Sequence, residues 1–440
     1  MRRIALLLLI GMLAVSACGD DGTLQSGSSD SAATSAASTT SAGEATTTTA
    51  AATTEAPSTT AATTTTQATT TEATTTTEAT TTTAALDHPL LPAALTRADV
   101  PWEALGPGWS FALFSTAAGY EDLEPPGDEI VVAYLVGPDG TPFEITRWPL
   151  HQAPFTIMDV RPDGRFAIVG IPEGGTHLLD LTTGTFEPFP AGVDGRYVTF
   201  TRPTGRDFVM TTEGTAEMRF SDGSVIADFG AIDDWYADYG VPYPPWLYGP
   251  GGVTVVINRP DGPVLIDNLG NQIRRLDEVG LDCRALRWWS EAEILVRCDI
   301  PSPEHYLLRQ LWLVNRDASV APKALTPVAE SFFEPGFDGY VDALRAGDSV
   351  LLQGFYAAGS GWFPIHAWSP DGPPERLTAE EPAGQLVTGN ADSFALLLYG
   401  CCGEVYGGLT HYTHGGEVLS RLDAPEGIYG VTDARGVGAP

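Results

Sequence analysis

From residue 87 to the end of the chain, short runs of β-branched and aromatic residues alternate with turns rich in Gly, Pro and Asp. Each run is long enough for one strand, and the runs are evenly spaced. No convincing amphipathic helical pattern appears after residue 110. Many short strands of this kind predict an all-β domain, built as a sandwich, a barrel or a propeller.

A two-strand pattern repeats along this region and decides among these folds. Each copy has an apolar strand, a turn built on Gly, Asn or Asp, and a second strand that ends near Leu-Thr or Leu-Asp. The copies lie at residues 133–147, 178–190, 218–230, 264–277, 311–326, 365–378 and 409–423. Their ends are separated by 43, 40, 47, 50, 52 and 44 residues, which matches one four-stranded propeller blade of ~40–50 residues. Seven copies predict a seven-bladed β-propeller.

A second hairpin precedes most copies, and it is clearest in FTIMDV-RPDG-RFAIVG, residues 155–170. The second blade is therefore predicted with strands at 155–160, 165–170, 176–181 and 185–189. Its turn, RPDGR, resembles the Ser-Pro-Asp-Gly-Arg turn of the TolB/WD40-like repeat family at four of five positions. In such a turn Pro presets one backbone angle, while Asp and Gly tolerate the left-handed ones. The resemblance implies a β-propeller and does not extend to a functional site.

The two ends of the repeat region are predicted to meet. The first copy has only three obvious strands, at 109–115, 129–136 and 143–147, and lacks an innermost one. The C-terminal sequence GIYGVTDARG, residues 427–436, looks like FTIMDVRPDG. We expect this last strand to complete the first blade, because an incomplete ring would leave open strand edges.

The chain begins MRRIALLLLIGMLAVSAC. Two arginines, a short apolar run and small residues before Cys18 have the arrangement of a secretory signal, predicted over residues 1–17. The apolar run is too short for a membrane-spanning helix of ~20 residues. Val-Ser-Ala directly before Cys18 resembles a bacterial lipobox, which implies cleavage before Cys18 and acylation of its thiol.

Residues 18–86 separate this cysteine from the repeats, and after Cys18 they are almost wholly Thr, Ala, Ser and Gly with a few acidic residues. Such a segment buries too little apolar surface to offset the entropy of ordering, so it is predicted to be a disordered stalk. Its end-to-end distance would be on the order of 45 Å. The stalk is either O-glycosylated or bare. Residues 87–440 form the predicted propeller, held at the extracytoplasmic face of the cell membrane by the lipid alone.

The charge of the chain excludes one class of partner. Of 56 acidic and 23 basic residues, 49 acidic and 21 basic residues lie from residue 87 onward, a net charge of −28. Binding to phosphate backbones or anionic lipid needs basic patches. We therefore expect no nucleic-acid partner and no membrane contact besides the anchor, and we expect a monomer.

Four cysteines remain after Cys18, and disulfides are permitted outside the cytoplasm. Cys283 opens and Cys298 closes one predicted hairpin, CRALRWWSEAEILVRC, and their positions are opposite each other across its centre. We predict a Cys283–Cys298 disulfide and a vicinal Cys401–Cys402 disulfide, although four cysteines allow three connectivities. A redox role for the vicinal pair is the alternative to a stiffened loop.

The sequence CCGEVYGGLTHYTH, residues 401–414, combines cysteines and histidines as zinc sites do. In the predicted blade, however, Cys401 and Cys402 lie in a loop at one rim and His414 in a turn at the other. A strand of this length spans ~25 Å, whereas zinc ligands lie within about 2.3 Å of one ion. No metal site is predicted, and His411 and His414 are interpreted as polar strand and turn residues.

Aromatic and acidic residues gather in the loops that connect the second strand to the third and one blade to the next. Exposed rings with carboxylates between them suit stacking on a sugar, or docking of a peptide or protein. An equally supported alternative is that the rings pack between blades. The candidate ligand-binding residues are Asp233, Asp234, Trp235, Tyr236, Tyr239, Tyr243, Phe332, Phe333 and Trp362.

No nucleophile elbow, zinc-protease motif or phosphate-binding glycine loop is present in the sequence. No cofactor and no catalytic residue are predicted. The first hypothesis is a surface-anchored lipoprotein whose propeller binds a carbohydrate, a peptide or an envelope protein without catalysis. The second is a propeller enzyme that acts on extracellular carbohydrate or another small substrate through rim carboxylates. A third is a nearly passive envelope scaffold.

Overall fold

The computed structural model describes residues 88–118, 128–171, 174–189, 197–212, 214–233, 245–300, 308–326, 337–347, 349–356, 365–368, 374–377, 384–399, 407–425 and 427–438. The predicted signal, Cys18 and the stalk lie outside the described residues. The described part is built of strands, with three short 3-10 helices, η1 (Arg97–Asp99), η2 (Trp102–Ala104) and η3 (Leu150–Gln152). Within that part, no helix has the length and apolar content needed to span a bilayer.

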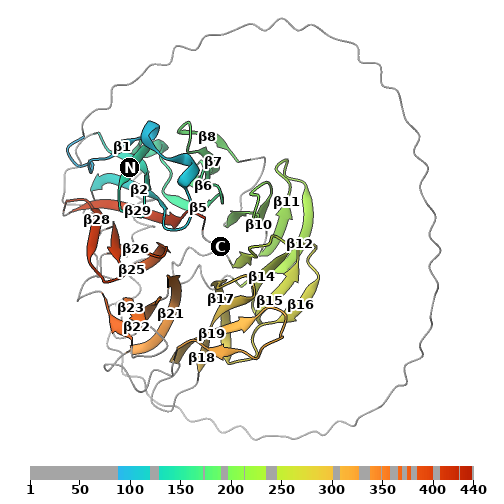
Figure 1. The fold of residues 1–440 in the computed structure, drawn as a ribbon. Coiled ribbons are helices and arrows are strands. Elements are labelled where there is room, and N and C mark those ends of the chain that lie inside the picture. Colours follow the sequence, from blue (N-terminus) through green and yellow to red (C-terminus); the bar gives the residue numbers. More distant parts are fainter. Residues whose placement is uncertain are drawn as a thin grey trace, which may run out of the picture. The chain divides into compact units, whose positions relative to one another are not determined.

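Apart from β1, the described strands pair antiparallel into seven sets of four, numbered here along the chain (Figure 1). Set 1 contains β29 (Ile428–Gly436), β2 (Ser110–Ala118), β3 (Ile130–Val136) and β4 (Pro142–Pro149). Set 2 contains β5 (Thr156–Val160), β6 (Phe166–Ile171), β7 (Gly175–Asp180) and β8 (Thr185–Pro188). Set 3 contains β9 (Val198–Phe200), β10 (Phe208–Thr212), β11 (Thr215–Arg219) and β12 (Val225–Ala231). Set 4 contains β13 (Trp246–Tyr248), β14 (Thr254–Arg259), β15 (Gly262–Asp267) and β16 (Gln272–Arg275).

The remaining sets follow the same order, from the innermost strand outward. Set 5 contains β17 (Leu281–Trp288), β18 (Glu293–Ile300), β19 (Leu308–Asn315) and β20 (Lys323–Ala324). Set 6 contains β21 (Phe337–Ala346), β22 (Ser349–Tyr356), β23 (Ile365–Trp368) and β24 (Glu375–Arg376). Set 7 contains β25 (Gly384–Gly389), β26 (Ser393–Tyr399), β27 (Gly407–Thr413) and β28 (Val418–Leu422). First strands of neighbouring sets contact each other, for example β29 with β5 and β5 with β9, which places them around the centre.

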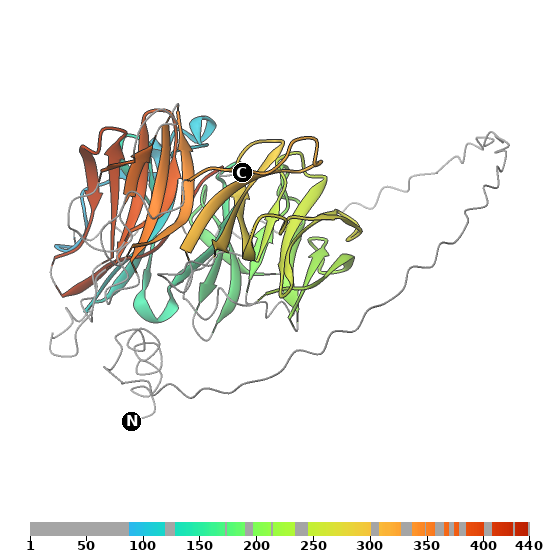
Figure 2. The ribbon, with the colours of Figure 1, turned by 90° about the horizontal axis from the view of Figure 1, so that it is seen from below.

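Seven buried apolar clusters hold the sets together, and each cluster joins one set to the next. Strand β3 shows how one strand serves two clusters. Val131, Ala133 and Leu135 pack toward set 2, while the alternate residues Val132 and Tyr134 pack toward set 7. Side chains alternate between the faces of a strand, so a strand buried on both faces reads as a continuous apolar run. The clusters close a ring, and the predicted all-β propeller is confirmed (Figures 1 and 2).

The predicted closure by the C-terminal strand is also present. Strand β29 pairs antiparallel with β2, from Ser110 opposite Gly436 to Ala118 opposite Ile428. Its side chains Val431 and Ala434 belong to the cluster between sets 7 and 1. The sequence did not reveal β1 (Leu95–Thr96), which pairs parallel with β4 and covers the outer edge of set 1. Edges covered in this way do not offer open backbone groups to other chains.

Candidate functional site

Asp233 is the one predicted ligand-binding residue that the described ranges include. It follows β12, and its backbone N–H donates to the carbonyl oxygen of Asn258 at 2.8 Å. Its carboxylate lies 2.5 Å from Nη2 of Arg284 on β17, and the two side chains are 15% and 11% exposed. This carboxylate therefore has a partner inside the ring. The other rim residues, Asp234, Trp235, Tyr236, Tyr239, Tyr243, Phe332, Phe333 and Trp362, lie outside the described residues and stay predictions.

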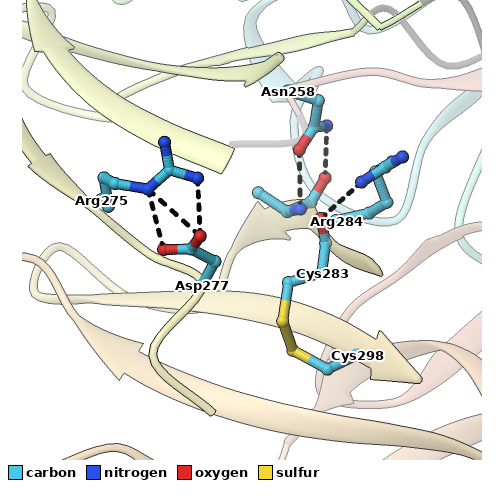
Figure 3. The surroundings of a disulfide bond; sticks show 7 residues. Asn258, Arg275, Asp277, Cys283, Arg284 and Cys298 are labelled. Atoms are coloured by element: carbon cyan, nitrogen blue, oxygen red, sulfur yellow. Dashed lines mark hydrogen bonds and ion pairs between the residues drawn. A yellow bond between two sulfur atoms is a disulfide. The ribbon is translucent and has the colours of Figure 1, made fainter. Parts of the chain in front are cut away.

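Buried polar groups next to Arg284, the partner of Asp233, connect sets 4 and 5; Figure 3 shows Arg284 and Asn258 beside the Cys283–Cys298 bond. The side-chain amide of Asn258 accepts from the backbone N–H of Ala285 at 2.8 Å and donates to its carbonyl oxygen at 2.9 Å. Arg284 also donates through Nη1 to the carbonyl oxygen of Cys283 at 2.9 Å. Because buried polar groups are costly when they lack a partner, these bonds fix the start of β17 against its neighbours.

The predicted Cys283–Cys298 disulfide is present and joins β17 to β18 (Figure 3). The Cα atoms lie 4.0 Å apart, and the two residues are separated by 15 positions. Both cysteines are buried and belong to the apolar cluster between sets 4 and 5. Cys401 and Cys402 lie outside the described residues, so the vicinal bond stays a prediction.

Polar side chains from the innermost strands reach neighbouring sets. In five of these strands the pairing register shifts immediately before the polar residue, as in a β-bulge. A bulge inserts one extra residue and thereby re-aims the side chain that follows. The residues in question are Asp433, Asp159, Arg287, Asp342 and Thr388.

The carboxylates of this group are engaged in bonds between sets. Asp159 accepts from the backbone N–H of Phe200 at 2.8 Å and from Arg202 at 3.0 and 3.1 Å. Asp342 pairs with Arg287 across sets 5 and 6. A carboxylate that accepts from both an arginine and a backbone N–H is well suited to holding two strands together. These two carboxylates, with Asp433, are therefore structural bridges near the centre of the ring.

Two histidines are buried in the outer parts of the ring. Burial lowers the pKa of His411 on β27 to about 4, against the opposite effect of Asp139. His411 lies on a strand, as expected, and neither of its ring nitrogens has a hydrogen-bond partner among the described residues. Burial, aided by the charge of Arg376, lowers the pKa of His366 on β23 to about 4. His414 instead lies in a turn, 3.0 Å from the carbonyl oxygen of Asn390.

A pocket of about 420 Å³ lies between sets 2 and 3. It is formed by the turns between the first two strands of each set and by the turn between β11 and β12. The lining residues are Arg161, Phe166, Leu178, Phe200, Thr204, Gly205, Arg206, Asp207, Phe208 and Ser221. Across the described ranges, no three His, Cys, Asp or Glu side chains come together as metal ligands would.

Aromatic rings make the floor of this pocket, and charged groups make its wall. Phe200 and Phe208 belong to the apolar cluster between sets 2 and 3, with ring centroids 5.6 Å apart. The guanidinium of Arg161 lies 3.9 Å from the centroid of Phe166. Arg206 is exposed, and burial raises the pKa of the adjacent Asp207 even though Arg206 acts to lower it.

Sequence reasoning placed the ligand on the opposite rim and missed this pocket. Sequence reasoning used RPDGR, which contains Arg161, only as a turn signal, and it did not single out RPTGRD, which contains Arg206. The two arginines lie in equivalent turns of neighbouring repeats, in a chain with a net charge of −33. These two positive charges in an acidic chain were the one sequence feature that pointed to the pocket. The sequence does not show that the two turns lie side by side.

Comparisons with known proteins concern the fold. No family model matches the chain, and no curated protein matches its sequence. Among solved structures, the β-propeller domain of the Trilobed protease from Pyrococcus furiosus is 11% identical, with a TM-score of 0.45, covering 74% of this chain and 95% of that one. BamB from Moraxella catarrhalis is 14% identical, with a TM-score of 0.34, covering 67% of this chain and 82% of that one.

Oligogalacturonate lyase from Vibrio parahaemolyticus is 12% identical, with a TM-score of 0.42, covering 72% of this chain and 86% of that one. At these identities and TM-scores, nothing known of these three proteins is transferred to this chain. The β-propeller itself rests on the strand pairings and on the seven apolar clusters between sets.

Proposed function

We propose that this chain is a lipid-anchored extracytoplasmic protein whose propeller binds a ligand or a protein partner without catalysis. The proposed extracytoplasmic location rests on the buried Cys283–Cys298 disulfide. Such bonds form and persist in oxidising compartments and are rare where thiols are kept reduced. Together with the signal and the lipobox-like sequence before Cys18, the disulfide supports export of the propeller before it folds.

The central carboxylates support binding over catalysis. Asp159 and Asp342 are each paired with an arginine, and Asp159 and Asp433 each accept a backbone N–H of the next set. A glycoside hydrolase needs two carboxyl groups ~5–9 Å apart across a cleft, one of them free to donate a proton. Carboxylates used as bridges between strands are not available for that role. The enzyme alternative therefore depends on carboxylates other than these bridges.

The anchor is tested by producing the full-length chain in a bacterial host with and without Cys18→Ser. We expect the parent chain to incorporate a radiolabelled fatty acid and to sediment with membranes. The variant should keep the Cys283–Cys298 bond but lose both the label and the membrane association. A labelled C18S variant would contradict acylation at Cys18, and a parent chain with reduced Cys283 and Cys298 would contradict the proposed compartment.

The binding role is tested with residues 87–440 on a glycan and secreted-protein array, compared with Trp235→Ala/Tyr236→Ala. The expected partner is a carbohydrate, a peptide or an envelope protein, bound by a monomeric propeller. Full retention of binding by the double variant would place the ligand elsewhere on the molecule. Turnover of a bound glycan, seen by mass spectrometry, would instead favour the enzyme alternative.

A further inference from the structure

We propose that the outer hairpins of sets 3 and 4 form a docking surface for a partner polypeptide in which large apolar residues are flanked by Lys or Arg. The surface lies on β11, β12, β15 and β16 and on the turns of these two sets, which are neighbours in the ring (Figure 1). It is separate from Asp233, which contacts Arg284 on an innermost strand, and it does not depend on the lipid anchor.

Exposed apolar side chains are concentrated on these two sets. The described residues include ten large hydrophobic side chains that are exposed, and half of them lie on sets 3 and 4. These five are between 49% and 71% exposed: Phe220, Val225, Val253, Leu269 and Ile273. Single exposed apolar residues are ordinary on a protein surface, whereas a group of them rimmed by polar residues indicates an interaction site.

The outer turn of set 4 lies directly against the outer strand of set 3. Gly270, next to Leu269, has φ of +86°, and a Cβ added there would lie 2.3 Å from the carbonyl oxygen of Asp228. Val225 lies three positions before Asp228 on β12, ~10 Å along the strand. The exposed apolar residues of the two hairpins therefore share one surface.

Hydrogen bonds hold the turns of this surface in place. Nδ2 of Asn268 donates to the carbonyl oxygen of Gly252 at 2.8 Å, so the turn that carries Val253 is tied to the outer hairpin of set 4. The carboxylate of Asp222 accepts from the backbone N–H of Ser224 at 2.9 Å and from its hydroxyl at 2.6 Å. A surface whose turns are already ordered loses less conformational entropy when a partner binds.

Three carboxylates of this surface form no ion pair with any described residue: Asp222, Asp228 and Asp267. Hydrogen bonds, above all from the side chain of Ser224, lower the pKa of Asp222. Hydrogen bonds from Asn271 lower the pKa of Asp267 in the same way. Both groups are therefore negatively charged at neutral pH.

The arginines of the outer strands are already paired with other carboxylates. Arg219 pairs with Glu217, Arg274 with Glu278, and Arg275 with Asp261 and Asp277, at 2.5 to 2.6 Å. Arg259 on β14 adds one guanidinium, which donates to the carbonyl oxygen of Phe229 at 3.2 Å. Three carboxylates against this one cation leave the surface with a net negative charge.

This charge selects the occupant of the surface. A second copy of the chain would bring the same carboxylates into the contact, and from residue 87 onward each copy has 49 acidic and 21 basic residues. A second copy and an anionic lipid surface are therefore both repelled. A polypeptide with Lys or Arg beside large apolar residues is attracted to the carboxylates and removes the exposed apolar side chains from water.

The test uses residues 88–440, which contain all seven apolar clusters, and selects binders from a phage-displayed library of random peptides. We expect the selected peptides to be enriched both in Lys or Arg and in large apolar residues. The most frequent peptide is then synthesised and titrated by isothermal calorimetry. It should bind the parent protein at one site, and its affinity should fall as the salt concentration is raised, because salt screens exposed charges.

Two variants test the surface itself. Phe220→Ser/Leu269→Ser removes exposed apolar area, and Asp222→Asn/Asp228→Asn/Asp267→Asn removes the charge but keeps an acceptor oxygen for each turn. Each variant should bind the peptide about tenfold more weakly than the parent does. The charge variant should also lose most of the salt dependence.

Matched controls on set 7 are Val418→Ser/Leu419→Ser and Asp392→Asn/Asp423→Asn, which change exposed residues of the same kinds. Both should bind the peptide as the parent does. The proposal is overturned if no peptide is enriched, if the enriched peptides lack basic or apolar residues, or if either surface variant binds like the controls.

Two further measurements examine the other occupants. A dimer in sedimentation equilibrium that dissociates in F220S/L269S would make a second copy the occupant and overturn the proposal. Binding to phosphatidylcholine vesicles that is lost in F220S/L269S would overturn it in favour of a bilayer. None of these outcomes bears on acylation of Cys18 or on the glycan array, so the two proposals fail separately.

Discussion

Asp433, in the last strand, accepts a hydrogen bond of 2.7 Å from the backbone N–H of Ile157, which lies 276 positions earlier in the chain. Nε of Arg435 donates to the carbonyl oxygen of Ile157 at 3.0 Å. The C-terminal strand therefore does more than supply an inner strand to set 1. It also binds the first strand of set 2, so one segment joins two sets at the point where the ring closes.

Asp433→Ala should weaken this closure. The variant leaves the buried N–H of Ile157 without an acceptor, which costs about 1–3 kcal/mol. We expect a lower urea midpoint in circular dichroism, with the strand content at neutral pH unchanged. Asp392→Ala, at an exposed turn, is the control and should leave the midpoint in place. Equal midpoints for D433A and the parent chain would show that the bond contributes nothing to closure.

Removing the Cys283–Cys298 bond should destabilise the propeller by about 3 kcal/mol, because the cross-link closes a loop of about 15 residues in the unfolded chain. The variant is Cys283→Ala/Cys298→Ala, measured by the shift of its urea midpoint. Cys401→Ser/Cys402→Ser serves as the comparison, and mass spectrometry of both unreduced proteins reports the bonds that form. If a reductant lowers the urea midpoint of the parent but not that of C283A/C298A, the stability lost on reduction comes from the Cys283–Cys298 bond.

The buried histidines should make the protein sensitive to mild acid. The folded-state pKa values of His411 and His366 are lowered to about 4, below the unfolded value of about 6.5. The unfolded chain therefore binds protons first as the pH falls. The stability conferred by each neutral histidine is complete above pH about 6.5 and is lost at about 1.4 kcal/mol per pH unit toward pH 4.

His411→Gln should therefore lower the slope of unfolding free energy against pH between about 6.5 and 4, by about 1.4 kcal/mol per unit at most. The slope is measured by urea titrations at several pH values. His151→Gln, at an exposed 3-10 turn, controls for the change of residue type. A slope in H411Q identical to that of the parent would mean that the ring of His411 is protonated in the folded state as readily as in the unfolded chain.

Asp233→Ala should cost stability, because it removes the partner of a nearly buried guanidinium. We expect a loss of about 1–3 kcal/mol, as for other hydrogen-bonded charges, seen as a lower urea midpoint. Trp235→Ala/Tyr236→Ala should leave the midpoint near that of the parent if those rings serve a ligand. If D233A keeps the parent midpoint, the Asp233–Arg284 pair is not structural and the carboxylate is available to a ligand.

The fold was predictable because each repeat contains the residue pattern of its own strands and turn. The apolar runs and the turn residues define each hairpin locally, and the copies recur every 40 to 52 residues. Seven hairpins that cannot bury their apolar faces alone have few ways to pack. The closing strand was predictable for the same reason, since GIYGVTDARG carries the pattern of an innermost strand. The disulfide followed from positions within a single hairpin.

The inner bridges and the pocket could not be predicted, because they depend on which residues of different sets meet. One bulge residue before Asp433 or Asp159 decides which neighbour the carboxylate reaches, and a bulge leaves no clear mark in the apolar pattern. The sequence alone determined the hairpins, the repeat and the Cys283–Cys298 bond, since these are set by contacts close along the chain. Only the tertiary structure decided that Arg284 faces Asp233 and that Arg161 adjoins Gly205, since packing between sets brings those residues together.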